Sequence, residues 1–194
     1  MKTKKVLKYI KSKDSTLKNL NIEHKKFKNL EVSNVAIKKS VFFSCLFKKV
    51  SINADIENVD FSMCEFKNVK FEGNTDEVFD GTSVSNVHFY GCTFRNVNFD
   101  LFDIDDKVSF DDCTGVYLFN RNGGRVCIAT EFDDCLMVKA GCFWGTLKEF
   151  EEASYNKYVF DGYEEDPYKN QIEYLKSIEK DLYSKSKKEI VLMA

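Results

Sequence analysis

The fold is decided by a stretch that reads LKNLNIEHKKFKNLEVSNVAIKKSVFFSCLFKKVSI from Leu17 to Ile52. Large apolar residues recur there at every fifth position, and a second column of mainly apolar or small residues lies two positions before each of them. An α-helix would spread such a column around its circumference, and an ordinary strand would send alternate members to opposite faces. The large residues of the first column are Leu17, Ile22, Phe27, Val32, Ile37, Phe42, Phe47 and Ile52.

A short extended segment that turns a corner after about five residues explains this period. Four such segments form one square coil, and successive coils stack at about the 4.8 Å spacing of β-strands. The period continues to Phe110, with a slip of one residue between Ile52 and Ile56 and a break after Phe71. The break contains EGNTDEV at residues 72–78, whose Gly, Asn and Asp favour turns and predict a loop.

Three segments of this region, CLFKK, MCEFKNVKFEG and GCTFRNVNFD, resemble the pentapeptide-repeat family. The resemblance implies a right-handed quadrilateral β-helix, with Leu or Phe at the central inward site and a small residue two positions earlier. We therefore expect an all-β repeat solenoid followed by a small α-helical C-terminal module. The expected domains are a basic N-terminal segment at 1–14, the β-helix at 15–130 with a loop near 72–78, and a capping or helical module at 131–194.

Residues four sides apart stack vertically in such a coil. When the interruption is counted as a single side, one column of the structural core contains only phenylalanine. Its members are Phe27, Phe47, Phe66, Phe89 and Phe110. Cys45, Cys64 and Cys92 occupy the small inward site, where a thiol acts as a compact apolar group.

The segment after Phe110 loses the five-residue period. RNGG at 121–124 predicts a tight turn between the apolar segments VYLF and VCIA, which we interpret as a hairpin that closes the β-helix. Thr146 and Glu149 form a capping-box pattern that predicts a helix to about Lys157. A second short helix is predicted from Asp166-Pro167, with an apolar stripe made of Tyr168, Ile172, Leu175, Ile178 and Leu182.

The C-terminal module is expected to cap the open end of the β-helix, with Phe143 and Trp144 packed over the last coil. Its KAGCFWGTLKEF segment resembles the tail module of some small phage-encoded proteins. The final EIVLMA, at residues 189–194, is a candidate edge strand or apolar patch for homodimerisation.

The charge distribution is bipolar although the formal net charge is only −2. Residues 1–52 contain fourteen Lys and three acidic residues, a balance of +11, and residues 53–112 contain four basic and fourteen acidic residues, a balance of −10. Acidic groups on a rod can occupy the sites that a nucleic-acid-binding enzyme uses for phosphates. The predicted acidic partner surface comprises Asp76, Glu77, Asp100, Asp103, Asp105 and Asp106, and the predicted basic surface comprises Lys38, Lys39, Lys48 and Lys49.

Several function classes receive no support from the sequence. The cysteine spacings match no usual zinc pattern, His24 and His88 lack an evident nucleophile, and no nucleotide-binding motif accompanies Gly123-Gly124. We therefore expect no enzyme activity, no cofactor and no metal. The chain has no stretch long and apolar enough for a signal peptide or a membrane span, which predicts a cytoplasmic location, in the host cytoplasm if a phage encodes it.

The resemblance adds a partner class, because several pentapeptide-repeat proteins are DNA mimics that bind topoisomerases. The sequence thus favours a non-enzymatic binding protein, most concretely an inhibitor that uses partial DNA mimicry against a nucleic-acid-acting host or defence enzyme. We expect no membrane contact and no direct binding of nucleic acid, because the lysines are scattered along the chain and no aromatic stacking platform accompanies them. The alternative is a structural or assembly module that homodimerises or docks other proteins.

Overall fold

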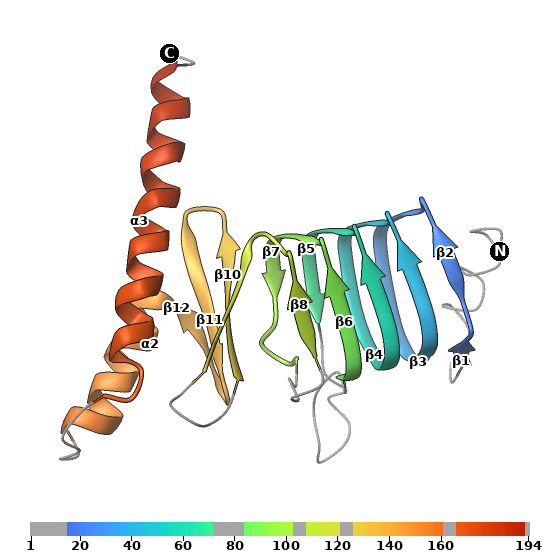
Figure 1. The fold of residues 1–194 in the computed structure, drawn as a ribbon, viewed down its shortest axis with the longest axis horizontal. Helices are drawn as coiled ribbons and strands as arrows, with labels where there is room; N and C mark the ends of the chain where they lie inside the picture. The colour runs from blue at the N-terminus through green and yellow to red at the C-terminus, as the bar shows by residue number, and fades with distance from the viewer. Residues whose placement is uncertain (1–14, 72–83, 103–107, 121–125, 161–165, 193–194) are drawn as a thin grey trace. The chain divides into compact units, whose positions relative to one another are not determined.

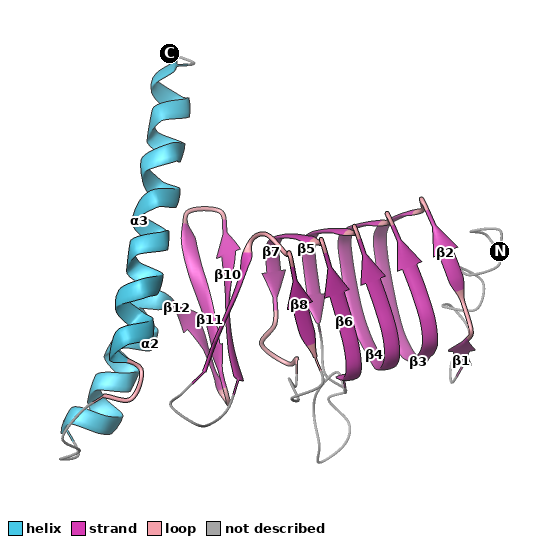
Figure 2. Ribbon diagram, viewed as in Figure 1, coloured by secondary structure: helices cyan, strands magenta, loops and turns pink. Residues whose placement is uncertain are grey.

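The computed structural model describes residues 15–71, 84–102, 108–120, 126–160 and 166–192 (Figure 1). The chain divides into two compact units with a boundary between Val116 and Tyr117. This boundary precedes the predicted one at 130/131. The predicted boundary falls inside a strand, Val126–Phe132, that belongs to the sheet of the second unit. In the described part of the chain the first unit consists of strands, and the helices occur in the second (Figure 2).

The first unit is a β-solenoid of about four turns, as predicted. Its strands pair in parallel from one coil to the next, and the long strands continue around corners. The strands are β1 (Ser15–Lys18), β2 (Asn21–Glu23), β3 (Lys26–Phe43), β4 (Leu46–Ser62), β5 (Glu65–Phe71), β6 (Val84–Tyr90), β7 (Thr93–Asn98) and β8 (Ser109–Asp111).

Each coil has four faces, which we number in the order in which the chain first reaches them. A central apolar residue points inward on each face, and the pairing register and ring stacking place equivalent residues above one another. In order of face, these inward residues are Leu17, Ile37, Ile56 and Val84; Ile22, Phe42, Phe61, Phe89 and Phe110; Phe27, Phe47, Phe66 and Phe94; and Val32, Ile52, Phe71 and Phe99.

The predicted single phenylalanine column is divided between two faces. Phe66 pairs with Phe94, whereas Phe89 pairs with Phe61 and Phe110 on the adjoining face. Phe71 lies on face 4, and Val84, the next described residue, pairs with Ile56 on face 1. Counting the interruption as one side therefore assigned every later residue to the wrong face. Residues 72–83, including the predicted loop at 72–78, lie outside the described part of the chain.

The one-residue slip in the sequence period corresponds to a bulge between β3 and β4. Ser33 pairs with Asn53 and Val35 pairs with Ala54, so Asn34 is an extra residue in the earlier coil. Most other corners are turned by a residue with positive φ, such as Asn29, Asn68 and Asn96. Asn tolerates this left-handed conformation better than most residues, which explains its recurrence at the end of a side.

The second unit combines a four-stranded sheet with two helices. Its strands follow the order β12-β11-β10-β9, and β11 pairs antiparallel with both β10 and β12. The predicted strands around RNGG are present as β9 and β10, but the β11–β12 hairpin was missed. The elements are β9 (Val116–Asn120), β10 (Val126–Phe132), β11 (Cys135–Ala140), β12 (Phe143–Thr146), α2 (Leu147–Tyr155), the π-helical turn η1 (Asn156–Phe160) and α3 (Lys169–Leu192).

Helices α2 and α3 both pack against β11. The capping box is formed, since Thr146 Oγ1 accepts from the Glu149 backbone N–H and Glu149 Oε2 accepts from the Thr146 backbone N–H. The predicted apolar stripe of α3 is also present: Tyr168, which precedes the helix, Ile172 and Leu175 are buried. However, α3 has 24 residues, so it is not short, and residues 189–192 of the predicted edge strand are helical.

Phe143 and Trp144 have partners within the second unit. The Phe143 ring packs against Phe150, with centroids 5.3 Å apart, and the Trp144 ring meets Phe132 edge to face. The core of this unit is centred on fully buried Leu136, Val138 and Leu175. A hydrophobic cluster of this kind explains why the second unit is compact by itself.

Candidate interaction surface

The exterior of the β-solenoid is an array of side-chain rows. On each side the residues immediately before and after the central inward residue point outward, because neighbouring positions of an extended chain alternate. The parallel register then places equivalent outward residues of successive coils directly beside one another. Stacked phenylalanine rings inside the coil, with centroids 4.7 to 5.4 Å apart, give the scale of this repeat.

Face 3 carries a continuous row of cations, which we call the basic column. It consists of Lys28, Lys48, Lys67 and Arg95, one from each of four successive coils. Lys28 pairs in register with Lys48, Lys48 with Lys67, and Lys67 with Arg95. Among the described residues, none of these four cations has an ion-pair partner. The basic column is therefore a surface whose positive charges form no ion pair within the described part of the chain.

Only Lys48 of the basic column was among the residues predicted as a basic surface. The missed members share a signal in the sequence: each cation directly follows a central phenylalanine of face 3, at Phe27, Phe47, Phe66 and Phe94. The net charges of residues 1–52 and 53–112 did not indicate this row, because Lys67 and Arg95 lie in the second range, whose charge balance is negative. Charge is thus organised by face as well as along the coil.

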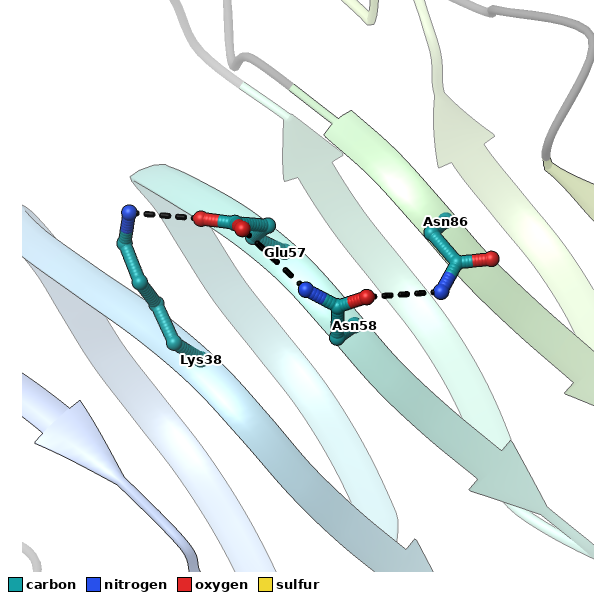
Figure 3. A network of polar contacts seen from close by, with 4 residues as sticks. All are labelled: Lys38, Glu57, Asn58 and Asn86. Atoms are coloured by element: carbon teal, nitrogen blue, oxygen red, sulfur yellow. Dashed lines mark hydrogen bonds and ion pairs between the residues drawn. The ribbon is translucent and has the colours of Figure 1, made fainter.

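The predicted basic residue Lys38 is neutralised locally. Its Nζ lies 2.6 Å from Glu57 Oε2, and this contact with Glu57 raises the pKa of Lys38 and lowers the pKa of Glu57. Asn58 Nδ2 donates to Glu57 Oε1 at 3.1 Å, and Asn86 Nδ2 donates to Asn58 Oδ1 at 2.7 Å (Figure 3). Face 1 therefore carries a polar network across coils in which Lys38 is already paired, and exposed Lys18 lies beside Lys38 in the same row.

The other two predicted basic residues, Lys39 and Lys49, are exposed at corners. Both adopt positive φ, at 49° and 54° respectively. Lys49 turns the corner that follows face 3, directly after Lys48 of the basic column. Lys39 belongs to the corner after face 1, so the structure does not gather the four predicted lysines on one face.

Most of the predicted acidic surface lies outside the described residues. This applies to Asp76 and Glu77 and to three carboxylates of the later cluster, Asp103, Asp105 and Asp106. Asp100 is described and half-buried, and its backbone N–H donates to Asn98 Oδ1 at 2.7 Å. Exposed carboxylates that the structure does describe include Asp55, Asp60 and Glu65, which belong to one coil.

Face 2 exposes apolar side chains. Val41 and Phe43 flank the inward Phe42, and Tyr90 follows the inward Phe89 two coils later. Met63 lies at the corner beyond this face with 53% of its surface exposed. His24 meets Phe43 edge to face, with ring centroids 5.7 Å apart. Face 2 thus differs from face 3, where the outward positions beside the basic column are Lys26, Leu46, Glu65 and Thr93.

A histidine and a serine meet on face 2, although the sequence showed no partner for His88. His88 Nδ1 lies 3.0 Å from Ser109 Oγ, and Ser109 Oγ donates to Asp111 Oδ2 at 2.8 Å. The serine proton points to the carboxylate, so His88 is not placed as a base for it. Both hydrogen bonds are exposed, which provides none of the water exclusion that nucleophilic sites use.

The inward cysteines stack at the corner between faces 2 and 3. Cys45, Cys64 and Cys92 are buried, and Cys113 continues the series with partial exposure. Each thiol donates to a backbone carbonyl of the preceding coil; for example, Cys64 Sγ donates to Phe42 O at 3.3 Å and Cys92 Sγ to Phe61 O at 3.3 Å. The thiols therefore satisfy corner carbonyls while filling small inward sites. Within the described residues no group of three or more His, Cys, Asp or Glu side chains is arranged to hold a metal ion.

Comparison with known proteins bears on the first unit. Residues 52–101 match the family model described as pentapeptide repeats (9 copies). This segment is similar to that family model over about a quarter of the chain. The matched repeats begin in β4 and end just after β7, so they carry the part of the basic column formed by Lys67 and Arg95.

A solved structure of QnrB1, a plasmid-mediated fluoroquinolone resistance protein, is similar to the chain at 13% sequence identity. The similarity covers 50% of this chain and 81% of that one, with a TM-score of 0.18, a value too low to support a structural conclusion. No curated protein matches the chain. In the part of the chain that the structure describes, no helix is both long and apolar enough to cross a membrane.

Proposed function

We propose that this chain is a non-catalytic binding protein that presents the charged exterior of its pentapeptide-repeat solenoid to a nucleic-acid-acting enzyme. The observation that carries the proposal is the parallel register, which fixes outward side chains in regular rows from coil to coil. A rigid array of charges recognises a macromolecular surface without the ordering cost that flexible chains incur. The described rows and faces of the solenoid are surfaces that a macromolecule can contact.

The acidic part of the solenoid indicates what kind of partner it would bind, namely an enzyme whose nucleic-acid site is lined with cations. Residues 53–112 carry a balance of −10 in the sequence, and enzymes that bind duplexes line their sites with cations that pair with phosphates. We infer that these carboxylates imitate part of a phosphate backbone and inhibit a host or defence enzyme such as a nuclease or topoisomerase. Partial rather than extended mimicry follows from the overall charge of only −2.

Competition with DNA tests this proposal. The chain is immobilised, and binding of a purified type II topoisomerase and of a defence nuclease is measured at increasing salt, with and without competing duplex. Binding should weaken with salt and be displaced by the duplex. Reversal of Asp100, Asp103, Asp105 and Asp106 to Lys should abolish it, whereas reversal of the same number of charges in the second unit, at Asp133, Asp134, Glu152 and Glu173, should not. Enzyme binding that persists at high salt and after reversal of Asp100, Asp103, Asp105 and Asp106 would refute the electrostatic mechanism.

A second candidate function, assembly through homodimerisation, is favoured by the length of α3. The helix continues through Leu192, well beyond Leu182, the last member of its predicted apolar stripe. A helix that ends in EIVL can pair with a second copy. Sedimentation equilibrium should then show a concentration-dependent dimer that deletion of residues 189–194 removes, and a monomer at every concentration would exclude this role.

A further inference from the structure

The basic column on face 3 places like charges beside one another, and none of them forms an ion pair among the described residues. Like charges directly opposite one another on neighbouring strands are destabilising. In this column the cations follow one another at about the strand spacing of 4.8 Å. In the neighbouring outward row of the same face, Glu65 is the sole acidic residue among the described positions, beside Lys26, Leu46 and Thr93. An external anion bound along this row would remove the repulsion.

The composition of face 3 favours phosphates over an acidic protein as the bound anion. Protein interfaces are depleted in Lys at their centres and depend on buried aromatic or Arg anchors. Face 3 aligns three Lys and one Arg, of which Lys28 and Arg95 are exposed and Lys48 and Lys67 are half-buried. The exposed aromatic side chains Phe43 and Tyr90 lie on face 2. Contacts from Lys and Arg to phosphate oxygens need no such anchors.

The same composition favours a duplex over a single strand. Proteins that bind single strands use exposed aromatic residues on which bases stack. None of the described outward positions on face 3 is aromatic. The basic column spans about 14 Å, three intervals of about 4.8 Å, and a duplex carries one phosphate charge per roughly 1.7 Å of its axis. A stretch of that length supplies enough phosphates for all four cations.

We propose that Lys28, Lys48, Lys67 and Arg95 form a binding surface for the phosphate backbone of duplex nucleic acid, without readout of base sequence. The sequence alone favoured no direct nucleic-acid binding because its lysines are scattered; the pairing register aligns three of them with an arginine. This surface is distinct from the proposed acidic partner surface. The charge reversals at Asp100, Asp103, Asp105 and Asp106 leave the basic column intact, so the two proposals fail separately.

The test is the salt dependence of binding to labelled duplex DNA, measured by fluorescence anisotropy with the full chain. Two duplexes of unrelated sequence should bind with equal affinity. The logarithm of the binding constant should fall with the logarithm of salt concentration at about 0.9 per phosphate contact, up to roughly 3.6 for four contacts. The affinity should therefore fall up to about 150-fold between 50 and 200 mM salt.

Charge-matched variants assign this binding to face 3. The variant K28Q/K48Q/K67Q/R95Q should lose the salt-dependent binding. The control K18Q/K148Q/K169Q/K180Q removes the same number of exposed positive charges elsewhere and should keep both the slope and the sequence independence. A column variant that binds with the parent's slope, or a control that loses binding to the same extent, would overturn the proposal.

Two further measurements keep the test decisive. Circular dichroism and thermal melting establish whether the column variant is folded. If it is not, the four single substitutions are measured instead, and each must lower the salt-dependence slope of DNA binding by about 0.9. Unchanged slopes would overturn the proposal. Polyglutamate and phosphatidylserine vesicles are measured at the same salt. If either binds more tightly than the duplex, and the column variant loses that binding, face 3 takes an acidic protein or a lipid surface and the duplex assignment is wrong.

Discussion

Phe66 stacks on Phe94 of the next coil, with ring centroids 5.0 Å apart and planes within 4° of parallel, whereas Phe89 meets Phe66 across a corner at 75°. The core of the solenoid therefore contains two adjacent phenylalanine stacks that contact each other edge to face. Stacking and edge-to-face contact are both favourable ring geometries, so Phe66 has a favourable neighbour along the coil axis and another across the corner. The outward rows inherit their alignment from these stacks.

The interior stack should dominate the stability of the first unit. Phe66 is 0% exposed, and Phe66→Ala should lower the free energy of unfolding by roughly 3–5 kcal/mol through lost burial and a cavity. Phe43→Ala is the matched control, because Phe43 is 41% exposed on the outside and should change stability by no more than about 0.5 kcal/mol. Urea denaturation followed by circular dichroism measures both, and equal losses would contradict the inward assignment.

The corner after face 2 stores backbone strain that can be relieved. Met63 adopts φ 52°, and Gly91 adopts φ 59° at the same corner of the next coil. Met63→Asn should raise the free energy of unfolding by up to about 1 kcal/mol, because Asn tolerates this conformation and Met63 is largely exposed. Gly91→Ala should lower it by more than about 1 kcal/mol, since the added Cβ is strained and would lie 2.7 Å from Met63 Sδ. Thermal melting that ranks the variants in the opposite order would contradict this account.

The capping box should stabilise α2. Thr146→Ala removes the side-chain acceptor for the Glu149 N–H and should cost about 1 kcal/mol in the unfolding of the second unit. Thr146→Ser keeps the oxygen and should restore most of that stability. Chemical denaturation compares the three proteins, and a Ser variant as unstable as the Ala variant would assign the loss to the missing methyl group instead of the cap.

The contribution of Glu149 should depend on pH in a defined direction. Hydrogen bonds from the Thr146 backbone and side chain lower the pKa of Glu149 in the folded chain. Its stabilisation is therefore present above the unfolded-state pKa of about 4.3 and is lost as the pH falls through the lower folded-state value. Glu149→Gln should be destabilising at pH 7, and this destabilisation should disappear as the pH falls below the folded-state pKa. Glu152→Gln on the same helix serves as the control, and a destabilisation by Glu149→Gln that persists in acid would refute the pKa shift as its cause.

The stacked cysteines should be protected from modification. Cys45, Cys64 and Cys92 are 2%, 2% and 1% exposed, whereas Cys142 is exposed. Iodoacetamide labelling followed by peptide mass spectrometry should modify Cys142 first and reach the three buried thiols only at the rate at which the solenoid opens. Urea should remove the difference. Equal labelling in the native protein would show that these side chains do not point inward.

The sequence predicted the second unit only in part, for reasons visible in particular residues. Thr146 and Glu149 are local partners three positions apart, so the helix start could be read directly. The hairpin of β11 and β12 was missed because its apolar residues, from Cys135 onward, form a nearly continuous run that gives no alternating pattern. Those strands are defined by pairing with β10 and by the helices that cover β11.

The sequence by itself determined that the first unit is a four-sided solenoid, because only such a coil buries an apolar residue at every fifth position. The tertiary structure decided which faces carry which rows. Spacing along the chain cannot reveal on which face the coil resumes after the interruption, since the hydrogen-bond register that places Val84 beside Ile56 sets the face of every later residue. An error of one side in the count assigns Phe89 to the stack of Phe66 instead of the stack of Phe61. That register is also what aligns Lys67 with Arg95 and completes the basic column.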